Sequence, residues 1–362
     1  MRYVTLGDVC KKASSNVAQK DILSIDGEYP IYGASGLIKT VDFYHQEQPY
    51  IAIVKDGAGV GRSMLLPEHS SVIGTMQYII PNELVDIKYL YYAIVHMNLA
   101  KYYMGAAIPH IYFRDYQKEP LKLPLLSEQK RIAAIFEKID SIIEFRNTQL
   151  AQLEQVVKSR FIELFNGYDE TTKLSEVAVV TGGLTKNSKR DQLPMRMPYL
   201  RVANVAFASI DVTEILDIGL TQDEYEKTLL EYEDMLFVEG NGSPDQIGRV
   251  AIWRNEITPC VHQNHLIKAR FNQSKVKPVF AMHYFMSQSG REQIKSKAVS
   301  TSGLFTLSVS KVADLLMPVP PMDIQEHFVA FVEQTDKSKL AVQQGLQELE
   351  ILKKSLMQQY FG

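Results

Sequence analysis

The side chains of this sequence that could carry chemistry lie in short polar stretches, two of which are rich in glycine. Residues 55–62 read KDGAGVGR, and residues 239–249 read EGNGSPDQIGR. Neither stretch has the Gly-Lys-Ser/Thr ending of a nucleotide-binding phosphate loop, and no helical pattern follows the first. We interpret both as turns between strands rather than as nucleotide sites. Glycine in such turns lets backbone N–H groups approach phosphate closely.

Metal binding and catalysis find little support in the sequence. Cys260, His262 and His265 have ligand-type side chains, but residues 262 and 265 of a strand would point to opposite faces, and no fourth ligand is near. Pro244 and Asp245 lack the downstream acid-x-Lys element of common nucleases, and the chain contains no Asn-Pro dipeptide of an amino-group DNA methyltransferase. No Ser/His/Asp set has a diagnostic context. We therefore expect a non-catalytic chain without a metal or cofactor of its own.

What remains is a supply of groups suited to the edges of DNA bases, since Asn and Gln can pair bidentately with adenine and Arg with guanine. In the first half of the chain the candidates are Tyr32, Tyr44, His45, Arg62, Gln77, Tyr78, His110, Tyr112 and Arg114. In the second half they are Lys186, Asn187, Lys189, Arg201, Asn204, Asn241, Gln246, Arg249, His262, Gln263, Asn264 and His265. Singly, each is more often an ordinary surface or turn residue. The hypothesis depends on their occurrence in loops of two duplicated domains.

Two long helical segments must position these groups. After Pro124, residues 125–166 contain no Gly or Pro, and positions 136, 143, 150, 157 and 164 are all apolar. This heptad column predicts a long helix with a seam for a second helix. A similar segment occurs 196 positions later. Residues 123–166 align without a gap with residues 319–362, and Gln129 aligns with Gln325. A repeat of this length predicts the order globule, long helix, globule, long helix.

Each globule mixes short strands with one or two helices, which indicates an α+β fold. Strands are expected at 29–32, 50–54 and 72–81, with a helix at 88–100, and in the second globule at 199–206, 234–238, 250–253 and 261–271, with a helix at 279–286. Residues 107–113 and 303–309 share the offset of 196 and are expected to form a closing strand. The predicted parts are 1–122, 123–168, 169–318 and 319–362.

Composition sets few limits on this plan. The chain has 362 residues, 46% of them hydrophobic, which suits two domains of a soluble protein. Two cysteines fit a reducing cytoplasm, and neither a signal peptide nor a membrane-spanning run is found. The net charge of −3 argues weakly against nucleic acid. However, eleven acids and only Lys227 as a base lie between residues 211 and 245, with basic clusters on either side, so a basic face is possible.

With these features the chain resembles the specificity (S) subunits of type I DNA restriction–modification systems over essentially its whole length. The resemblance is carried by PLLSEQK at 124–130 before the long helix, its weaker echo PPMDIQ at 320–325, YPIYGASG at 29–36 and the two glycine turns. The second copy departs from the pattern with Asp323 and Ile324 where Ser127 and Glu128 stand in the first.

The resemblance implies that each globule is a target recognition domain reading one half of a bipartite double-stranded DNA site. Two antiparallel helices would fix the gap, with half-sites about one helical turn, roughly 34 Å, apart. Two modification subunits would dock on this chain, bind S-adenosylmethionine and methylate a flipped adenine. Restriction subunits using ATP and Mg²⁺ would join them. Candidate contacts for the modification subunits are Ile135, Ile142, Phe161 and Phe165, unless these side chains simply cover the globules.

Two other interpretations remain open from the sequence. One is a scaffold whose tandem globules bind proteins rather than DNA, with the helices as a dimerisation device. Balanced charge slightly favours it, and salt-sensitive DNA binding would argue against it. The other is a complete enzyme, which would methylate or cut DNA without partner chains.

Overall fold

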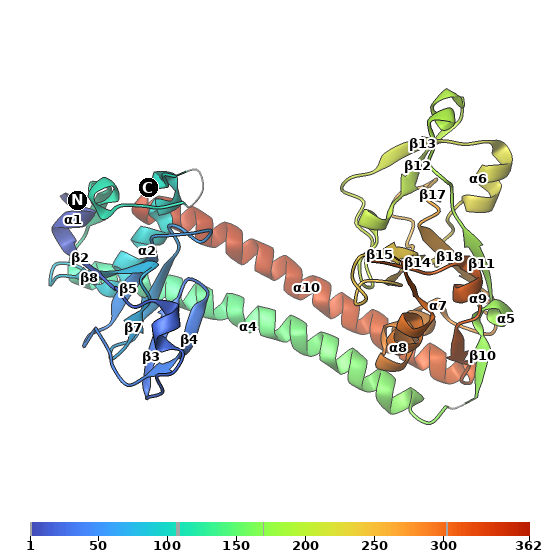
Figure 1. Ribbon diagram of the computed structural model, residues 1–362, viewed down its shortest axis with the longest axis horizontal. Helices are drawn as coiled ribbons and strands as arrows, with labels where there is room; N and C mark the ends of the chain where they lie inside the picture. Colours follow the sequence, from blue (N-terminus) through green and yellow to red (C-terminus); the bar gives the residue numbers. More distant parts are fainter. Residues whose placement is uncertain (1, 106–108, 169, 302) are drawn as a thin grey trace. The chain divides into compact units, whose positions relative to one another are not determined.

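A computed structural model of the chain describes residues 2–105, 109–168, 170–301 and 303–362 (Figure 1). Ala107 and Ile108, which belong to a predicted closing strand, lie outside the described residues. The chain divides into two compact units. Unit 1 consists of Met1–Gln149 and Val342–Gly362, and unit 2 consists of Leu150–Ala341.

Unit 1 is built on a four-stranded antiparallel sheet with the strand order β2-β8-β5-β6. Its strands are β2 (Cys10–Ser14), β5 (Tyr50–Val54), β6 (Ser63–Leu66) and β8 (Met76–Pro81). A second sheet contains β3 (Tyr29–Gly33), β4 (Gly36–Val41) and β7 (Ser71–Val72), and a third pairs β1 (Arg2–Thr5) with β9 (Pro120–Leu123). The helical elements are α1 (Leu6–Val9), η1 (Gln19–Ile22), α2 (Ile87–Met97), η2 (Leu99–Tyr102) and α3 (Phe113–Tyr116).

Unit 2 repeats this plan. Its main sheet, β11-β18-β14-β16, contains β11 (Ala178–Gly182), β14 (Met235–Val238), β16 (Val250–Ile252) and β18 (Leu266–Phe271). The other strands are β10 (Thr171–Lys173), β12 (Arg196–Leu200), β13 (Leu216–Gly219), β15 (Gly240–Asn241), β17 (Val261–His262), β19 (Val299–Thr301), β20 (Leu304–Thr306) and β21 (Leu316–Pro318). The helical elements are α5 (Leu174–Val177), η3 (Ser188–Gln192), η4 (Val202–Asn204), α6 (Gln222–Thr228), α7 (Pro278–Met286), α8 (Gln288–Lys297) and α9 (Val309–Ala313).

The main sheet of unit 1 is covered on both faces, because side chains alternate along a strand. In β5, Ile51 and Ile53 face a core that includes Tyr89 of α2 and Phe136, whereas Tyr50 and its alternate neighbours face a second core beside β7. A two-sided burial of this kind explains why β5 is apolar at every position rather than at every second one.

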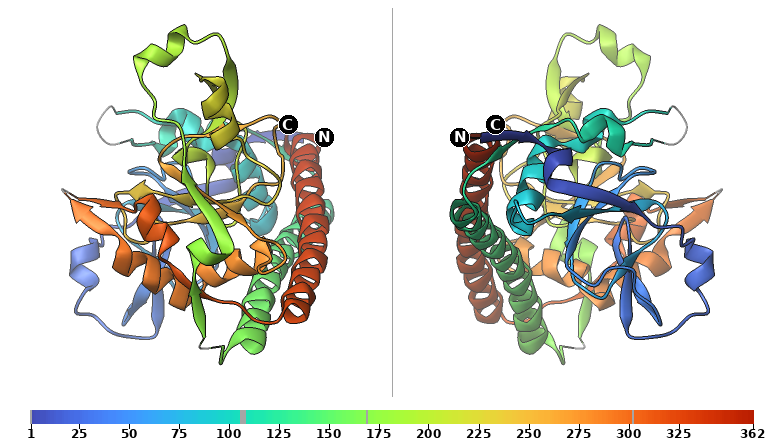
Figure 2. Two further views of the ribbon diagram at one scale, coloured as in Figure 1. Left: turned by 90° about the vertical axis from the view of Figure 1, so that its right-hand side faces the viewer. Right: turned by 90° about the vertical axis from the view of Figure 1, so that its left-hand side faces the viewer.

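The long helices are α4 (Leu126–Phe165) and α10 (Met322–Phe361), each of 40 residues. In unit 1, Phe136 near the start of α4 packs against Phe361 at the end of α10. In unit 2, Phe161 near the end of α4 packs against Phe328 near the start of α10. Within unit 1 the two helices run antiparallel, because Phe136 and Asp140 of α4 contact Phe361 and Lys353 of α10, which follow in reverse order along the chain. Figure 2 shows α4 in green beside α10 in red. None of the five positions in the apolar column of α4 (136, 143, 150, 157 and 164) is exposed.

A buried glutamine fixes the first turn of each long helix. The Gln129 amide accepts a hydrogen bond from the Asp86 N–H (2.8 Å) and donates to the carbonyls of Leu84 (3.1 Å) and Pro124 (2.9 Å). In unit 2 the Gln325 amide accepts from the Lys277 N–H (2.9 Å) and donates to the carbonyls of Lys275 (3.1 Å) and Pro320 (2.8 Å). Both glutamines are fully buried. The same three bonds thus recur in both units, with the glutamine and the proline offset by 196 residues and the other two partners offset by 191.

The α+β fold class, the internal repeat and both long helices are confirmed. The predicted helices at 88–100 and 279–286 correspond to α2 with η2 and to α7, and every predicted strand region except 107–113 contains a strand. The described residues 109–113 form only isolated bridges and the start of α3, so a closing strand is not found there. The division into parts 1–122, 123–168, 169–318 and 319–362 follows the secondary-structure elements, whereas the compact units each include a part of both long helices. Those boundaries stay a prediction. Within the described ranges, no helix is long and apolar enough to cross a membrane.

The glutamine contacts predict a specific stability change. Replacing Gln325 by Ala leaves one buried N–H and two buried carbonyls without a hydrogen-bond partner. The free energy of unfolding of unit 2 should therefore fall by about 3 kcal/mol. The full-length chain is unfolded in urea while the fluorescence of Trp253, the only tryptophan and a core residue of unit 2, is recorded. Gln334→Ala, an exposed site on the same helix, should change the value by less than about 0.5 kcal/mol. Equal midpoints for both variants would contradict the structural role of Gln325.

Candidate nucleic-acid interface

Both glycine turns occupy the same place in their units. In unit 1 the Val54 N–H donates to the Arg62 carbonyl, and the Gly61 N–H donates to the Val54 carbonyl (both 2.8 Å). In unit 2 the matching bonds are Val238 N–H to Arg249 carbonyl (2.9 Å) and Gly248 N–H to Val238 carbonyl (3.0 Å). Each turn leaves the strand at the centre of the main sheet, β5 or β14, and leads to the edge strand. The interpretation of both stretches as strand-connecting turns is confirmed.

The glycine that closes each turn is required by geometry. Gly61 and Gly248 have φ angles of 84° and 61°, in the left-handed region that favours glycine. A Cβ atom at Gly61 would lie 2.3 Å from the Ala100 nitrogen, and one at Gly248 would lie 2.4 Å from Cγ2 of Ile294. The turns are therefore pressed against η2 and α8, and their path is fixed.

The arginine after each glycine turn is tied to the main chain of the second sheet. The Arg62 guanidinium donates to the Ala34 carbonyl (3.1 Å), and the Arg249 guanidinium donates to the Val202 carbonyl (3.3 Å). Arg249 also donates to the side chain of Gln246 (3.0 Å), and burial lowers the pKa of Arg249. Arg62 keeps exposed surface, whereas Arg249 is half-buried and acts mainly by holding Gln246. Of these two turn arginines, only Arg62 is well placed to reach a ligand.

The turn of unit 2 is further braced by α8, a contact that no sequence pattern indicated. The Arg291 guanidinium donates to the carbonyls of Asp245 (3.1 Å), Ile247 (2.7 Å) and Gly248 (2.9 Å). Lys295, one helical turn later, pairs with the Asp245 carboxylate at 2.6 Å. Within this turn the Asn241 side chain accepts from the Ser243 N–H (2.9 Å), so Asn241 shapes the turn as well. The polar groups of the turn are held by a rigid frame.

The closing segments pack beside the turns at equivalent positions. The Ile111 N–H donates to the Lys55 carbonyl (3.0 Å), and 196 residues later the Leu307 N–H donates to the Glu239 carbonyl (2.7 Å). In unit 2 the predicted strand is present as β20, which pairs with β15 of the glycine turn. In unit 1 the described part of the segment has only isolated bridges of His110 to Asp56 and Met104.

Three predicted residues meet in that segment of unit 1, and we call them the Tyr112 cluster: His110, Tyr112 and Arg114. The His110 and Tyr112 ring centroids are 4.2 Å apart, and the Arg114 guanidinium lies 4.7 Å from the Tyr112 centroid. His110 also pairs with the Asp56 carboxylate in the glycine turn. The structure thus brings together side chains that are separated by more than fifty residues in the sequence.

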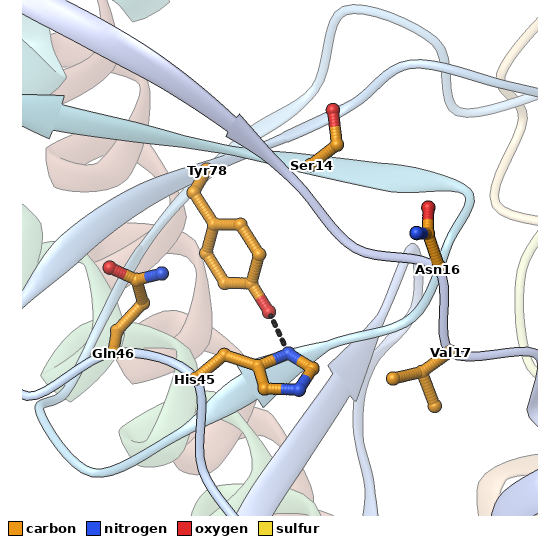
Figure 3. A pocket seen from close by; sticks show the side chains of 6 residues that line it. All are labelled: Ser14, Asn16, Val17, His45, Gln46 and Tyr78. Carbon is orange, nitrogen blue, oxygen red and sulfur yellow. Dashed lines mark hydrogen bonds between the residues drawn. The ribbon is translucent and has the colours of Figure 1, made fainter.

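A concavity of about 570 Å³ opens on the same unit and is lined by Ser14, Asn16, Val17, His45, Gln46 and Tyr78 (Figure 3). The Tyr78 hydroxyl accepts from the Val72 N–H (3.0 Å) and lies 3.1 Å from Nδ1 of the exposed His45. Burial raises the pKa of Tyr78, which keeps its phenol protonated. Tyr78 is therefore fixed at the base of the concavity. Tyr32 is half-buried in β3, and Tyr44 packs edge-on against Tyr29.

The prediction that Gln77, Asn204 and His262 contact DNA bases is wrong, because all three side chains are buried and hydrogen-bonded within their units. The Gln77 amide donates to the Tyr116 hydroxyl. The Asn204 amide accepts from the Arg201 N–H (2.9 Å) and donates to the carbonyls of Asp211 and Glu214, while the Arg201 side chain pairs with Glu214. These contacts leave no free polar surface for a base.

His262 is fully enclosed in unit 2. Its Nδ1 lies 3.0 Å from the Thr228 carbonyl, and burial lowers its pKa to about 4, so the ring is neutral. The next two residues, Gln263 and Asn264, are half-buried and keep part of their amides accessible. His265 is exposed and pairs with Glu239 at 2.7 Å.

Lys186, Asn187 and Lys189 are exposed around η3. Their position is fixed by the neighbouring Arg190, which is buried. The Arg190 guanidinium donates bidentately to Glu224 of α6 (2.7 and 3.0 Å) and also to the Gly219 carbonyl (3.0 Å). The Asn187 side chain accepts from the Lys189 N–H (3.1 Å) and so caps η3. The two lysines remain as cations presented by a rigid turn.

The predicted partner contacts divide into two groups. Ile135 and Ile142 are half-buried on α4. Phe161 and Phe165 are not placed for a partner contact but cover the globule of unit 2, the alternative that the sequence left open, because both are buried against Phe280 of α7 and Phe328 of α10. The strongly exposed apolar side chains of the long helices are instead Phe145, Val156 and Ile162 on α4, and Leu340, Ile351 and Leu352 on α10.

The arrangement can present fixed donors and acceptors but offers little for bond-making chemistry. Burial raises the pKa of the Cys10 and Cys260 thiols to about 12, so neither is a nucleophile at neutral pH. Over the ranges that the structure covers, no group of three His, Cys, Asp or Glu residues could hold a metal ion. Hydrogen-bonding recognition is the chemistry that these residues fit best.

Comparison with known proteins gives a consistent family. The model of the type I restriction modification DNA specificity domain matches residues 1–155 and again 169–351. The chain is 24% identical over 200 residues to a putative type I restriction enzyme MjaX specificity subunit of Methanocaldococcus jannaschii, covering 53% of this chain and 45% of that protein. It is 24% identical over 253 residues to the EcoKI specificity subunit of Escherichia coli K12, covering 64% and 53%. The matches thus span about half the length of these relatives.

A solved structure shares the fold. The crystal structure of the type I restriction-modification system S subunit from M. genitalium matches with a TM-score of 0.61 at 15% identity, covering 100% of this chain and 96% of that one. At this identity the likeness concerns the fold alone.

The Arg190–Glu224 pair predicts a pH dependence. The Arg190 guanidinium, helped by the Thr221 N–H, lowers the pKa of Glu224 from 4.5 to about 2. A lowered folded-state pKa stabilises the fold above about pH 4.5, and this contribution is lost as the pH falls towards about 2. Glu224→Gln should cost on the order of 1 kcal/mol at pH 7, since a third of the Glu224 side chain is exposed.

The difference between wild type and Glu224→Gln should shrink below pH 4.5 in urea titrations followed by Trp253 fluorescence. Glu226→Gln, an exposed carboxylate on the same helix, is the matched control. A difference that stayed constant between pH 7 and pH 2.5 would contradict the assignment.

Proposed function

Because the chain belongs to the family of type I restriction modification DNA specificity domains, we propose that it selects the DNA sequence on which a type I restriction–modification complex acts. On this proposal each unit reads one half of a bipartite site in double-stranded DNA. The chain itself performs no bond-making step.

The observation that carries the proposal is that both units share one backbone arrangement around the glycine turn but present different polar side chains on it. The glycine turn, the closing segment and the buried glutamine are bonded alike in both units. At equivalent places in that arrangement, unit 1 has His110 where unit 2 has Thr306, and Thr75 where unit 2 has His265. A duplicated scaffold with unlike side chains suits two unlike half-sites, because base edges differ in their donor and acceptor pattern.

The exposed groups around the turns are suited to both kinds of DNA contact. Lys186 and Lys189 can neutralise phosphates, whereas Arg62, Arg114, Gln263 and Asn264 can bond to base edges. Phosphate contacts orient a protein on the duplex without reading sequence, so the two classes of residue have separate roles.

The chemistry of the complex belongs, on this proposal, to other chains. Two modification subunits bind S-adenosylmethionine and methylate adenine, and restriction subunits use ATP and Mg²⁺. The exposed apolar side chains Phe145 and Ile351, 64% and 69% exposed, are suitable anchors for the modification subunits, together with the half-buried Ile135 and Ile142. Contiguous exposed apolar surface is typical of partner contacts, whereas single apolar residues are common on any protein surface.

Modular reading is tested by domain exchange. Replacing residues 173–309 with the matching segment of another family member should change one half of the methylated motif and leave the other half intact. The motif is mapped by methylation sequencing of cells that carry the partner subunits, with cells lacking this gene as the control. A change in both halves would contradict modular reading. Salt-insensitive or absent DNA binding by the complex would favour a protein-binding scaffold.

The long helices are expected to set the gap between the half-sites. Deleting residues 147–153 and 343–349 removes one heptad from each helix and keeps the seam in register. Two turns of helix measure about 10 Å, so the gap should shorten by about three base pairs while both half-sites stay the same. The readout is the methylated motif. An unaltered gap would show that helix length does not govern the spacing.

A further inference from the structure

Arg114 is the most exposed member of the Tyr112 cluster, with 74% of its side chain accessible. Its guanidinium lies over the Tyr112 ring, 4.7 Å from the centroid. Cation–π contact of this kind restricts the guanidinium to one plane while its N–H groups stay at the edge of that plane. The side chain is thus oriented without using its hydrogen-bond donors.

The donors of Arg114 are indeed available. No hydrogen bond from its guanidinium to another described residue is present, and the nearest carboxylate oxygen, of Asp115, lies 3.7 Å from Nε. Arg62, Arg190, Arg201, Arg249 and Arg291 all donate to carbonyl groups within their own units. Arg114 differs from these because its position is set by an aromatic ring.

The ring beneath Arg114 is itself anchored to the glycine turn of unit 1. Tyr112 contacts the imidazole of His110, which pairs with the Asp56 carboxylate. The main chain adds a second link, since the Gly57 N–H donates to the Pro109 carbonyl (2.9 Å). The Tyr112 cluster is therefore a rigid extension of the frame that both units share.

Unit 2 has no such cluster at the equivalent positions. The bonds of Ile111 and Leu307 fix the offset at 196, which places Thr306, Ser308 and Ser310 opposite His110, Tyr112 and Arg114. The Ser308 hydroxyl caps α9 and lies 2.9 Å from the Ser310 hydroxyl. The two copies thus differ in chemistry at a place where their backbones agree, as expected of a position that determines specificity.

We infer that Arg114 is a specificity-determining residue that bonds bidentately to O6 and N7 of a guanine in the half-site read by unit 1. Tyr112, His110 and Asp56 act as positioning residues for it. This inference rests on the proposed function. A planar guanidinium matches the two acceptors on the major-groove edge of guanine, and no other base offers that pair.

The test uses the full-length chain in complex with its modification subunits. The probe is a duplex carrying the bipartite motif mapped by methylation sequencing. A G·C pair is expected in the half-site of unit 1, and 7-deazaguanine at that position should weaken binding by the wild-type complex between about fivefold and about 150-fold, because it lacks N7. This measurement uses the wild-type protein and needs no substitution. Inosine at the same position, which keeps O6 and N7, should bind normally.

Variants then assign the contact to Arg114. Arg114→Ala should lose the preference for guanine at one position and should no longer respond to 7-deazaguanine, whereas Arg114→Lys should at most reduce the preference. Tyr112→Phe should keep the preference, and Tyr112→Leu should reduce it, because only the former retains a ring. Lys118→Ala, an exposed site four residues away, removes a positive charge and should leave the preference unchanged.

Failure of the inference and failure of the proposed function are distinguishable. If the complex selects a bipartite site but Arg114→Ala weakens all duplexes alike, Arg114 is a phosphate contact and the inference is wrong. A half-site of unit 1 without any G·C pair would overturn it equally. If the wild-type complex selects no DNA sequence, the proposed function fails and the inference fails with it.

Discussion

The structure depends on one buried amide in each unit. The amides of Gln129 and Gln325 each satisfy an N–H at the start of α2 or α7 and two carbonyls, one of them at the proline turn that precedes the long helix. Three segments converge there with main-chain groups that neither sheet nor helix can satisfy. A glutamine side chain, with one acceptor and two donors, fits the requirement, and a leucine of similar size would leave every one of these groups unpaired. The first turn of each long helix is thereby fixed to the body of its unit.

A fixed frame allows the rest of each unit to diverge. The segment after β2 is anchored in unit 1 by the apolar Ile22, whereas η3 of unit 2 is anchored by the ion pair of Arg190 and Glu224. The glycine turn is held by His110 in unit 1 and by Arg291 in unit 2. Different side chains perform the same structural task, because only the backbone path has to be preserved. The surface groups are then free to change with little cost to stability.

The repeat, the fold class and the long helices could be predicted because each follows from a periodic pattern that spans many residues. Burial of single polar residues could not. Gln77 and Tyr78 are adjacent in β8, yet both are buried, because the main sheet is covered on both faces. Phe161 lies off the apolar seam of α4 and was therefore a candidate for a partner contact, but α7 packs over it. Arg291 was missed because it acts on carbonyls 43 to 46 residues away, and no local pattern reports such a contact.

Charge explains how such a chain could be selective without binding DNA indiscriminately. With 39 basic and 42 acidic residues, the chain provides little long-range attraction to a polyanion. Non-specific affinity comes mainly from neutralised phosphates, whereas each good base contact adds about 1–3 kcal/mol of discrimination. On the proposed function, a nearly neutral reader with a few rigid base contacts contributes specificity, and the partner subunits contribute most phosphate contacts. Affinity and selectivity would then combine only in the assembled complex, so that the chain alone would not occupy random DNA.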